Sequence, residues 1–231
     1  MTSNSILLET AQDADLPAGE FSNWLNVMSR ALEGNGESDV PCGDCDACCR
    51  ASYFIEVKPE DEAARQRIPA VLLFDAPGAP TGYQLLGYDQ KGRCPMLEST
   101  GCTLYADRPQ TCRTFDCRLF AATGIAEADP AKADVTARAK RWQFHYADDA
   151  SREQHITLRR GARLLRELQD QGAADELPRT ATQLAMLAVQ LQPAFLAHAA
   201  LFDELEEQVA RDELSGAVLD AARAVMAAST R

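Results

Sequence analysis

The sequence predicts a mostly α-helical α+β protein, in which a small cysteine-rich region with short strands is followed by a C-terminal helical bundle. All eight cysteines fall between Cys42 and Cys117. Beyond Cys117 the composition turns to Ala, Leu, Glu and Arg, and apolar residues recur at helical spacing. We therefore expect three parts: an acidic N-terminal helix and linker (1–38), a cysteine-cluster domain (39–128) and a helical region packed on it (129–231).

The N-terminal part is predicted to contain one short amphipathic helix around residues 21–32. Its apolar residues, among them Phe21, Trp24 and Met28, lie three or four positions apart, which places them on one helical face. The turn residues Gly34-Asn35-Gly36 follow directly and predict the end of this helix.

The cysteine-rich region is predicted to carry two short strands. The β-branched and aromatic run 53–57 indicates the first, and Pro59 followed by acidic residues opens a short helix. Residues 76–82 are rich in Pro and Gly and predict a loop, after which 83–88 indicates a second strand.

From about Asp129 the pattern becomes helical. Asp129-Pro130 is a favourable cap and first-turn pair, Pro193 is predicted to start or kink a helix, and a last helix is expected over 214–226. Apolar residues also recur at helical spacing and form stripes along this part. Apolar stripes of this kind are typical of helix packing, so we interpret this part as a scaffold. The stripes comprise Leu158, Ala162, Leu165 and Leu168, then Leu184, Leu187, Ala188 and Leu191, then Phe195, Ala199, Phe202, Leu205 and Val209.

Charge and composition exclude some functions and favour one compartment. The chain has 35 acidic against 23 basic residues and a formal charge of −12, which disfavours binding to nucleic acid. The first residues lack the basic start of a secretory signal, and no apolar run approaches the roughly 20 residues of a membrane helix. We therefore expect a cytoplasmic, soluble protein without a membrane partner, where clustered cysteines serve as ligands or catalysts rather than disulfides.

The cysteine spacing predicts metal binding, because soft, negatively charged thiolates are the ligands that zinc and iron prefer. In "CGDCDACCR" (42–50), Cys42, Cys45 and Cys48 are spaced to wrap one centre. The side chain of the adjacent Cys49 diverges from that of Cys48, so Cys49 is expected to serve a second centre or none. The segment "CPMLESTGCTLYADRPQTCRTFDC" supplies four more thiols, which makes two four-thiolate sites possible, from Cys94, Cys102, Cys112 and Cys117.

These two segments together resemble the YkgJ-type cysteine-cluster family, a zinc- or iron-chelating CxxCxxCC domain that also occurs in flagellin lysine N-methylases. The family pattern continues with Cys-Pro and then Gly-Cys-x-x-Tyr-x-x-Arg-Pro-x-x-Cys-Arg-x-Phe-x-Cys, and this chain matches it from Cys94 to Cys117. The resemblance implies metal binding. It covers about a third of the chain and implies nothing about residues 130–231.

The metal is expected to be an iron–sulfur cluster, with zinc as the alternative. The CxxCxxC and Cys-Pro sequence patterns, together with the resemblance to the methylases, favour iron. Paired cysteines with distant partners bind zinc equally well. Arg108 and Arg113 match the family pattern, so we expect them to donate hydrogen bonds to the ligand sulfurs. Arg50, Arg93 and Arg118 also lie close to cysteines in the sequence. The expected metal ligands are Cys42, Cys45, Cys48, Cys49, Cys94, Cys102, Cys112 and Cys117.

The sequence leaves two functions open. One is a metal-cluster protein that supports redox or protein-modification chemistry, and the other is a zinc-stabilised protein–protein interaction module without catalysis. Either implies another protein as partner, and neither an enzymatic reaction nor an oligomeric state is predicted. The chain lacks a radical S-adenosylmethionine motif, a GxxxxGK[ST] loop and a GxGxxG segment. His145 and His155 are interpreted as ordinary histidines.

Overall fold

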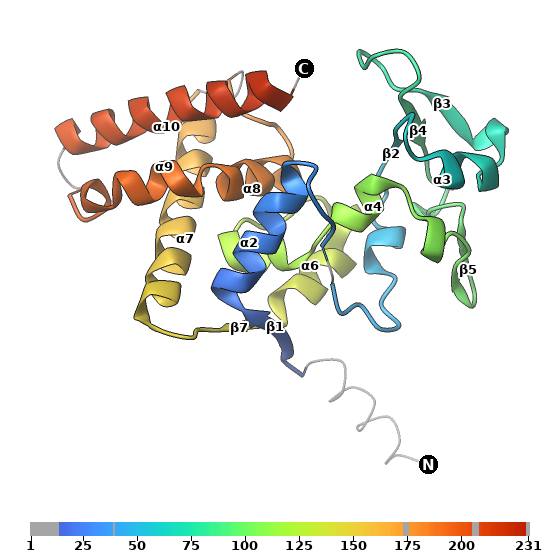
Figure 1. The fold of residues 1–231 in the computed structure, drawn as a ribbon, viewed down its shortest axis with the longest axis horizontal. Helices are drawn as coiled ribbons and strands as arrows, with labels where there is room; N and C mark the ends of the chain where they lie inside the picture. The colour runs from blue at the N-terminus through green and yellow to red at the C-terminus, as the bar shows by residue number, and fades with distance from the viewer. Residues whose placement is uncertain (1–13, 39, 173–175, 205–207, 230–231) are drawn as a thin grey trace. The chain divides into compact units, whose positions relative to one another are not determined.

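The structure is a computed structural model that describes residues 14–38, 40–172, 176–204 and 208–229. It divides into two compact units (Figure 1). Unit 1 comprises Met1–Ser29, Arg118–Ala126 and Ala139–Arg231, and unit 2 comprises Arg30–Cys117 and Glu127–Arg138. All eight cysteines belong to unit 2. The predicted class, α+β and mostly α, is confirmed.

Unit 1 is a helical assembly around the long helix α7, which packs against α5, α8 and α9, while α10 contacts α7, α8 and α9 (Figure 1). Its fully buried side chains include Leu158, Leu165 and Leu184, which belong to the predicted apolar stripes, and Leu214 of the last helix. No helix in the described ranges is both long and apolar enough to cross a membrane. The helices are α2 (Phe21–Leu32), which runs on into unit 2, α5 (Arg118–Thr123), α7 (Asp149–Asp170), α8 (Ala181–Gln190), α9 (Gln192–Ala197) and α10 (Gln208–Ser229).

The apolar stripe from Phe195 onward does not form one continuous helix. Helix α9 ends at Ala197, and a separate 3-10 helix covers Ala199–Phe202. The stripe marks packing at its start, because the rings of Phe195 and Phe202 contact edge to face at 6.2 Å between centroids. Its last member does not pack: Val209 is 77 % exposed, so the prediction that it is buried is wrong. Leu205 lies outside the described residues.

Unit 1 also contains a two-stranded parallel sheet, in which β1 (Leu16–Glu20) pairs with β7 (Trp142–His145). In β7 the buried Trp142 and the half-buried Phe144 alternate with exposed residues, as expected for a strand with one face towards the core. Strand β1 was not predicted, because Leu-Pro-Ala-Gly-Glu has little intrinsic strand preference. Its backbone is paired only because β7, more than 120 residues later in the sequence, lies beside it.

Unit 2 is built on a three-stranded antiparallel sheet with the order β2-β4-β3. The strands are β2 (Ile55–Val57), β3 (Leu73–Asp75) and β4 (Gln84–Leu86), and the two predicted strands correspond to β2 and β4. One face of this sheet packs on a small apolar cluster, to which Cys94 and Cys102 also contribute. The buried members of the cluster are Val57, Ala64, Ile68, Leu86 and Leu104.

The other elements of unit 2 are short. They are the helices α3 (Glu62–Arg67), α4 (Gln110–Thr114) and α6 (Ala133–Lys140, whose last two residues belong to unit 1), the hairpin of β5 (Leu97–Glu98) and β6 (Gly101–Cys102), and 3-10 helices at Ala47–Arg50, Ala70–Leu72, Tyr105–Asp107 and Pro130–Lys132. The predicted cap at Asp129 is present, since its carboxylate accepts a hydrogen bond from the N–H of Ala131 at 2.9 Å. Few residues of unit 2 are held by long regular elements, so its folding depends on turns and side-chain contacts.

The histidine of α7 is a buried, neutral part of the unit 1 core. His155 Nε2 donates to the carbonyl oxygen of Ala122 at 2.9 Å, which leaves Nδ1 to accept from the Tyr146 hydroxyl at 2.8 Å. The imidazole stacks on Phe21 with 4.2 Å between ring centroids. Burial lowers the pKa of His155 to about 4; the carbonyl of Ala122 opposes this effect and Arg159 adds to it.

Because the pKa of His155 is lower in the folded protein than its ordinary 6.5, unit 1 should lose stability as pH falls from 6.5 towards 4. The unfolded chain binds a proton in this window and the folded chain does not, so we expect unfolding to become easier by about 2 kcal/mol between about pH 7.5 and pH 5. Urea unfolding followed by the fluorescence of Trp24 and Trp142, the two tryptophans of the chain, reports on unit 1.

A His155→Gln variant is the control, because it lacks the titrating group and should show a flatter pH profile over the same range. The carboxylate of Glu20, at the start of α2, does not interfere. Burial opposes its ionisation, but hydrogen bonds from Ser151 and from the N–H groups of Asn23, Ser22 and Ala147 lower its pKa to about 2. The stability that ionised Glu20 contributes is therefore lost only as pH falls below 4.5, the ordinary pKa of its carboxyl group. Equal pH slopes in both proteins would contradict the prediction.

Candidate metal centre

The first cysteine segment is a run of tight turns. Gly43 adopts a positive φ of 55°, and the N–H of Cys45 donates to the carbonyl of Cys42 at 3.1 Å. A 3-10 helix at Ala47–Arg50 then carries Cys48 and Cys49. Ser52 follows at φ 53°, the left-handed region that non-glycine residues rarely adopt. The segment is thus wound tightly enough to bring its four thiols into one neighbourhood.

The second cysteine segment is attached to the first by backbone hydrogen bonds. The N–H of Cys94 donates to the carbonyl of Cys49 at 2.7 Å, and the N–H of Ser52 donates to the carbonyl of Gly92 at 3.0 Å. Strands β5 and β6 then pair Leu97 with Cys102, which returns Cys102 towards Cys94. These contacts explain why thiols more than 40 residues apart in the sequence can act together.

Two of these thiols accept hydrogen bonds from the backbone two residues later. The N–H of Met96 points to the sulfur of Cys94, and the N–H of Leu104 points to that of Cys102. Such bonds stabilise the thiolate form, which is the form that binds metal. They are outweighed by burial, which raises the pKa of Cys102 and raises that of Cys94 to about 11.

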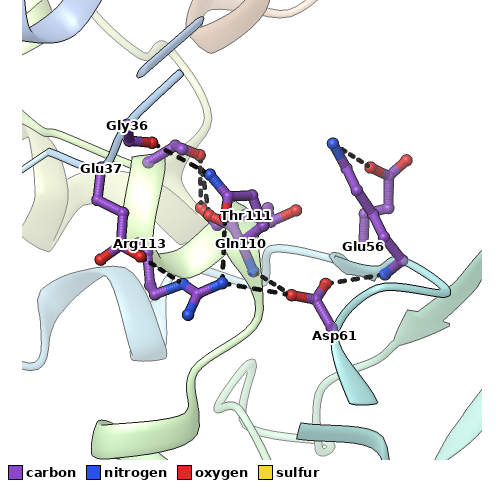
Figure 2. Close-up of polar contacts among 9 residues, drawn as sticks. Gly36, Glu37, Glu56, Asp61, Gln110, Thr111 and Arg113 are labelled. Carbon is purple, nitrogen blue, oxygen red and sulfur yellow. Dashed lines mark hydrogen bonds and ion pairs between the residues drawn. The ribbon is translucent and has the colours of Figure 1, made fainter. Parts of the chain in front are cut away.

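Helix α4 holds Cys112, and a buried carboxylate fixes the position of that helix (Figure 2). Asp61, which is 6 % exposed, accepts from the N–H of Gln110 at 2.7 Å and from the N–H of Lys58 at 2.9 Å. Arg113 lies 3.7 Å from the carboxylate of Asp61 and 3.3 Å from that of Glu37. The helix that carries Cys112 is therefore braced by charged and polar contacts rather than by a large apolar face.

Four thiols interact with one another in every pairing: Cys49, Cys94, Cys102 and Cys112. Burial and then the charges of the other three raise the pKa of Cys112 to about 12. Bringing four thiolates this close costs free energy unless a cation neutralises them, and a bound metal ion does so. This set consists of one cysteine from the first segment and three from the second.

The other interacting thiols are in the first segment. Cys42 interacts with Cys45 and Cys48, and burial is the main cause that raises the pKa of Cys42. The carboxylate of Asp116, next to Cys117 in the chain, raises it further, whereas Arg138 and Arg108 lower it. Arg138 also donates to the carbonyl of Cys42 at 3.3 Å. Cys117 directly follows Asp116 in the chain, so it is the cysteine next to the carboxylate that acts on Cys42.

Cys48 and Cys49 join the two groups. The thiol of Cys48 donates a hydrogen bond to the sulfur of Cys49, which lowers the pKa of Cys49 and raises that of Cys48. Burial and Asp46 oppose the effect on Cys49, while Arg108 and Arg50 add to it. Their sulfurs are in contact, yet Cys49 interacts with the second segment, and Cys48 interacts with Cys42 and Cys112.

Arg108 is the cation shared by the thiols. Its charge lowers the pKa of Cys42, Cys49, Cys102 and Cys112, each against the opposing effect of burial. The guanidinium carbon lies 3.9 Å from the centroid of the Tyr105 ring.

The remaining arginines near cysteines in the sequence have other partners. Arg50 pairs with Asp46 at 2.6 Å and Arg93 pairs with Asp89 at 3.1 Å, both exposed i, i+4 pairs. Arg118 belongs to unit 1, where it is 8 % exposed and donates to the carbonyl of Ala18 at 3.0 Å. Arg50 still lowers the pKa of Cys49, but sequence proximity alone did not single out Arg108, whose charge acts on four thiols.

Three charged residues of the site were not predicted from the sequence: Asp61, Asp116 and Arg138. Asp61 was assigned only to the start of a helix, yet it caps α4 across 49 residues of sequence. Asp116 is 1 % exposed and accepts from the Ser38 hydroxyl at 2.6 Å. The nearest signal in the sequence was the position of Asp116 directly before Cys117, whereas Arg138 lies beyond the cysteine-rich segment and carried none.

The donor set fits a thiolate-bound metal by its chemistry. It consists of sulfur donors that all belong to one compact unit. Two of the sulfurs accept a backbone N–H hydrogen bond, and the charge of Arg108 lowers the pKa of four of the thiols. Within the described ranges, no group of three or more His, Cys, Asp or Glu side chains is arranged to hold a metal ion. The sulfurs are therefore neighbours that have not converged on one point, and binding a metal would require them to close around it.

Comparison with known proteins finds one similarity, which lies in this segment. A family model described as "CxxCxxCC: Putative zinc- or iron-chelating domain" matches residues 41–143. No curated protein and no solved structure matches the chain. The matched segment contains all eight cysteines, Arg108 and Arg138. Residues 41–143 of this chain are therefore similar to the CxxCxxCC domain family, whose description is zinc- or iron-chelating.

Proposed function

We propose that this protein holds metal on its eight cysteines in two thiolate sets. The first set is Cys49, Cys94, Cys102 and Cys112. The second is Cys42, Cys45 and Cys48, with Cys117 as its fourth ligand. The observation that carries the proposal is the mutual interaction of all four thiols of the first set, a number that matches the four ligands of a closed zinc or iron–sulfur site.

The division of the adjacent cysteines between the sets rests on their other neighbours. The sequence predicts that the two side chains diverge, but in the structure the thiol of Cys48 donates a hydrogen bond to the sulfur of Cys49. The electrostatic neighbours of Cys49 support its assignment to the first set, because Cys94, Cys102 and Cys112 all come from the second segment. The carboxylate of Asp116 near Cys42 supports the assignment of Cys117 to the second set.

The metal we propose is iron in an iron–sulfur cluster, with zinc as the alternative. An all-cysteine site has no carboxylate ligand and no open position for water, so it favours electron transfer or structural support over hydrolysis. The centre would thus support redox or protein-modification chemistry in the cytoplasm, acting with another protein.

A second candidate function is a zinc-stabilised protein interaction module. It is favoured by an exposed aromatic group beside the sheet of unit 2, where Phe54 and Phe74 flank Gly87 and the Phe54 ring contacts Tyr88 at 5.0 Å. Phe54 is 54 % exposed, although large aromatic side chains usually gain free energy from burial. In this case the metal would only stabilise the fold.

Metal and sulfide analysis of the full chain, purified without oxygen, separates these functions. We expect brown protein with broad visible absorption that a reductant bleaches, because thiolate-bound iron–sulfur centres behave in this way. Colourless protein with stoichiometric zinc and no sulfide would support the interaction module instead. Protein without bound metal that takes up neither iron with sulfide nor zinc would contradict both.

Separate Cys48→Ser and Cys49→Ser variants test the two sets. Each should lose a different part of the metal content or of the visible spectrum, since each removes a ligand from a different set. Cys94→Ser should resemble Cys49→Ser, and Cys45→Ser should resemble Cys48→Ser. The same partial loss from all four variants would rule out the division.

A further inference from the structure

We propose that Arg108 is the residue that balances the charge of the metal centre, by donating its Nε–H to a ligand sulfur once metal is bound. The inference rests on the proposed thiolate centre and assigns a separate role to one residue beside it. Nε of Arg108 is buried, and among the described residues no acceptor is aligned to receive its hydrogen bond.

A buried donor without an acceptor is unfavourable, so it requires an explanation. The thiols on which the charge of Arg108 acts supply one, and Cys112 follows four residues later on α4. Its charge acts on Cys42 of one proposed set and on Cys49, Cys102 and Cys112 of the other. Four thiolates around a divalent ion carry a net negative charge, and a hydrogen bond from a guanidinium to sulfur disperses that charge. If the sulfurs closed around a metal, one of them would become the acceptor for the Nε–H of Arg108.

The position of the guanidinium is set independently of the metal. Its carbon stacks 3.9 Å from the Tyr105 ring centroid, a cation–π arrangement that orients the plane of the side chain. Pro109 follows directly and begins the turn into α4, which carries Cys112. The donor is therefore held beside the thiols by its own local structure.

Arg113 is the matched comparison, because it lies on the same segment and the sequence predicts the same role for it. Nε of Arg113 is also buried without an aligned acceptor, but it lies 3.3 Å from the Glu37 carboxylate. The guanidinium of Arg113 also lies 3.7 Å from Asp61 and donates to the Gln110 side chain at 3.1 Å (Figure 2). These partners are the carboxylate and amide oxygens that fix the position of α4. We therefore infer that Arg108 acts on the electronic properties of the centre, whereas Arg113 acts on stability alone.

Titration of the reduced, metal-free full chain with Co²⁺ tests this inference, because sulfur-to-cobalt charge-transfer absorption reports the electron density on the ligand sulfurs. Arg108→Met should weaken Co²⁺ binding roughly 10- to 100-fold and move the charge-transfer band to longer wavelength, since the sulfur lone pairs lose a hydrogen bond. Arg108→Lys should recover part of the affinity but not the band position, because an ammonium lacks the planar fork of the guanidinium.

Arg113→Met should leave the band where it is in the unmodified protein. An Arg108→Met protein with unchanged band position and affinity would overturn the inference, as would an equal band shift in Arg113→Met. If Arg108→Met does not fold, the band position of Arg108→Lys decides in the same way. Failure of the unmodified chain to bind Co²⁺ would instead refute the proposed metal centre, and the role of Arg108 with it.

Discussion

Chelation of the metal should unfold unit 2 and leave unit 1 intact. The apolar cluster of unit 2 is small, and two of the thiols, Cys94 and Cys102, pack against it. Most of the large, fully buried side chains, such as Phe21, Phe195 and Leu165, belong to unit 1. Structural metal sites contribute on the order of 10 kcal/mol to folding, which is more than the whole stability of many domains. Unit 2 should therefore unfold when the metal is removed.

Limited proteolysis and fluorescence give separate signals for the two units. After chelation under reducing conditions, trypsin should first cut within residues 50–113, at sites such as Arg67 and Arg93, while α7 to α10 remain protected. The fluorescence of Trp24 and Trp142, both in unit 1, should stay unchanged. Re-addition of metal before proteolysis is the control and should restore protection. Uniform resistance across the chain, with loss of metal demonstrated, would contradict the prediction.

Gly161→Ala should destabilise unit 1 by about 3 kcal/mol, because there is no room for a methyl group where α7 meets α9. A Cβ atom at Gly161 would lie 2.3 Å from the ring of Phe195, a side chain that is 0 % exposed and cannot move without displacing its neighbours. Urea unfolding followed by tryptophan fluorescence measures the change, since both tryptophans report on this unit.

Gly216→Ala in α10 is the matched control, because nothing lies within 4 Å of the Cβ atom it would add. Alanine is the better helix former, so this variant should gain about 0.5–1 kcal/mol instead. The two substitutions are chemically identical and differ only in their surroundings. Equal effects at both positions would show that Phe195 does not pack closely on Gly161.

The long helices could be predicted from the sequence because their signals are local. The spacing of Leu158, Ala162 and Leu165 defines one face of α7, and Pro193 marks the start of α9, without reference to any distant residue. The exact ends were less predictable. Helix α9 stops at Ala197 although the apolar stripe continues, because the spacing of apolar residues does not record the hydrogen bonds that define a helix.

The strands were harder to predict, because pairing depends on partners far away in the sequence. Strand β1 exists because β7 lies beside it, and its own residues have little strand preference. Strand β3 was missed for a similar reason: Leu73–Asp75 is three residues long, too short to show an alternating pattern, and it is paired by β4.

For the candidate site, the sequence by itself determined the chemistry: the number of thiols, their clustering in one region and their match to a metal-chelating pattern. These follow from composition and spacing, which need no fold. Only the tertiary structure decided which groups are neighbours. It grouped Cys49 with Cys94, Cys102 and Cys112, and it directed Arg113 to carboxylates while Arg108 acts on the thiols. The physical reason is that electrostatic interactions depend on distance in space, and the chain turns between Cys49 and Cys94 set that distance.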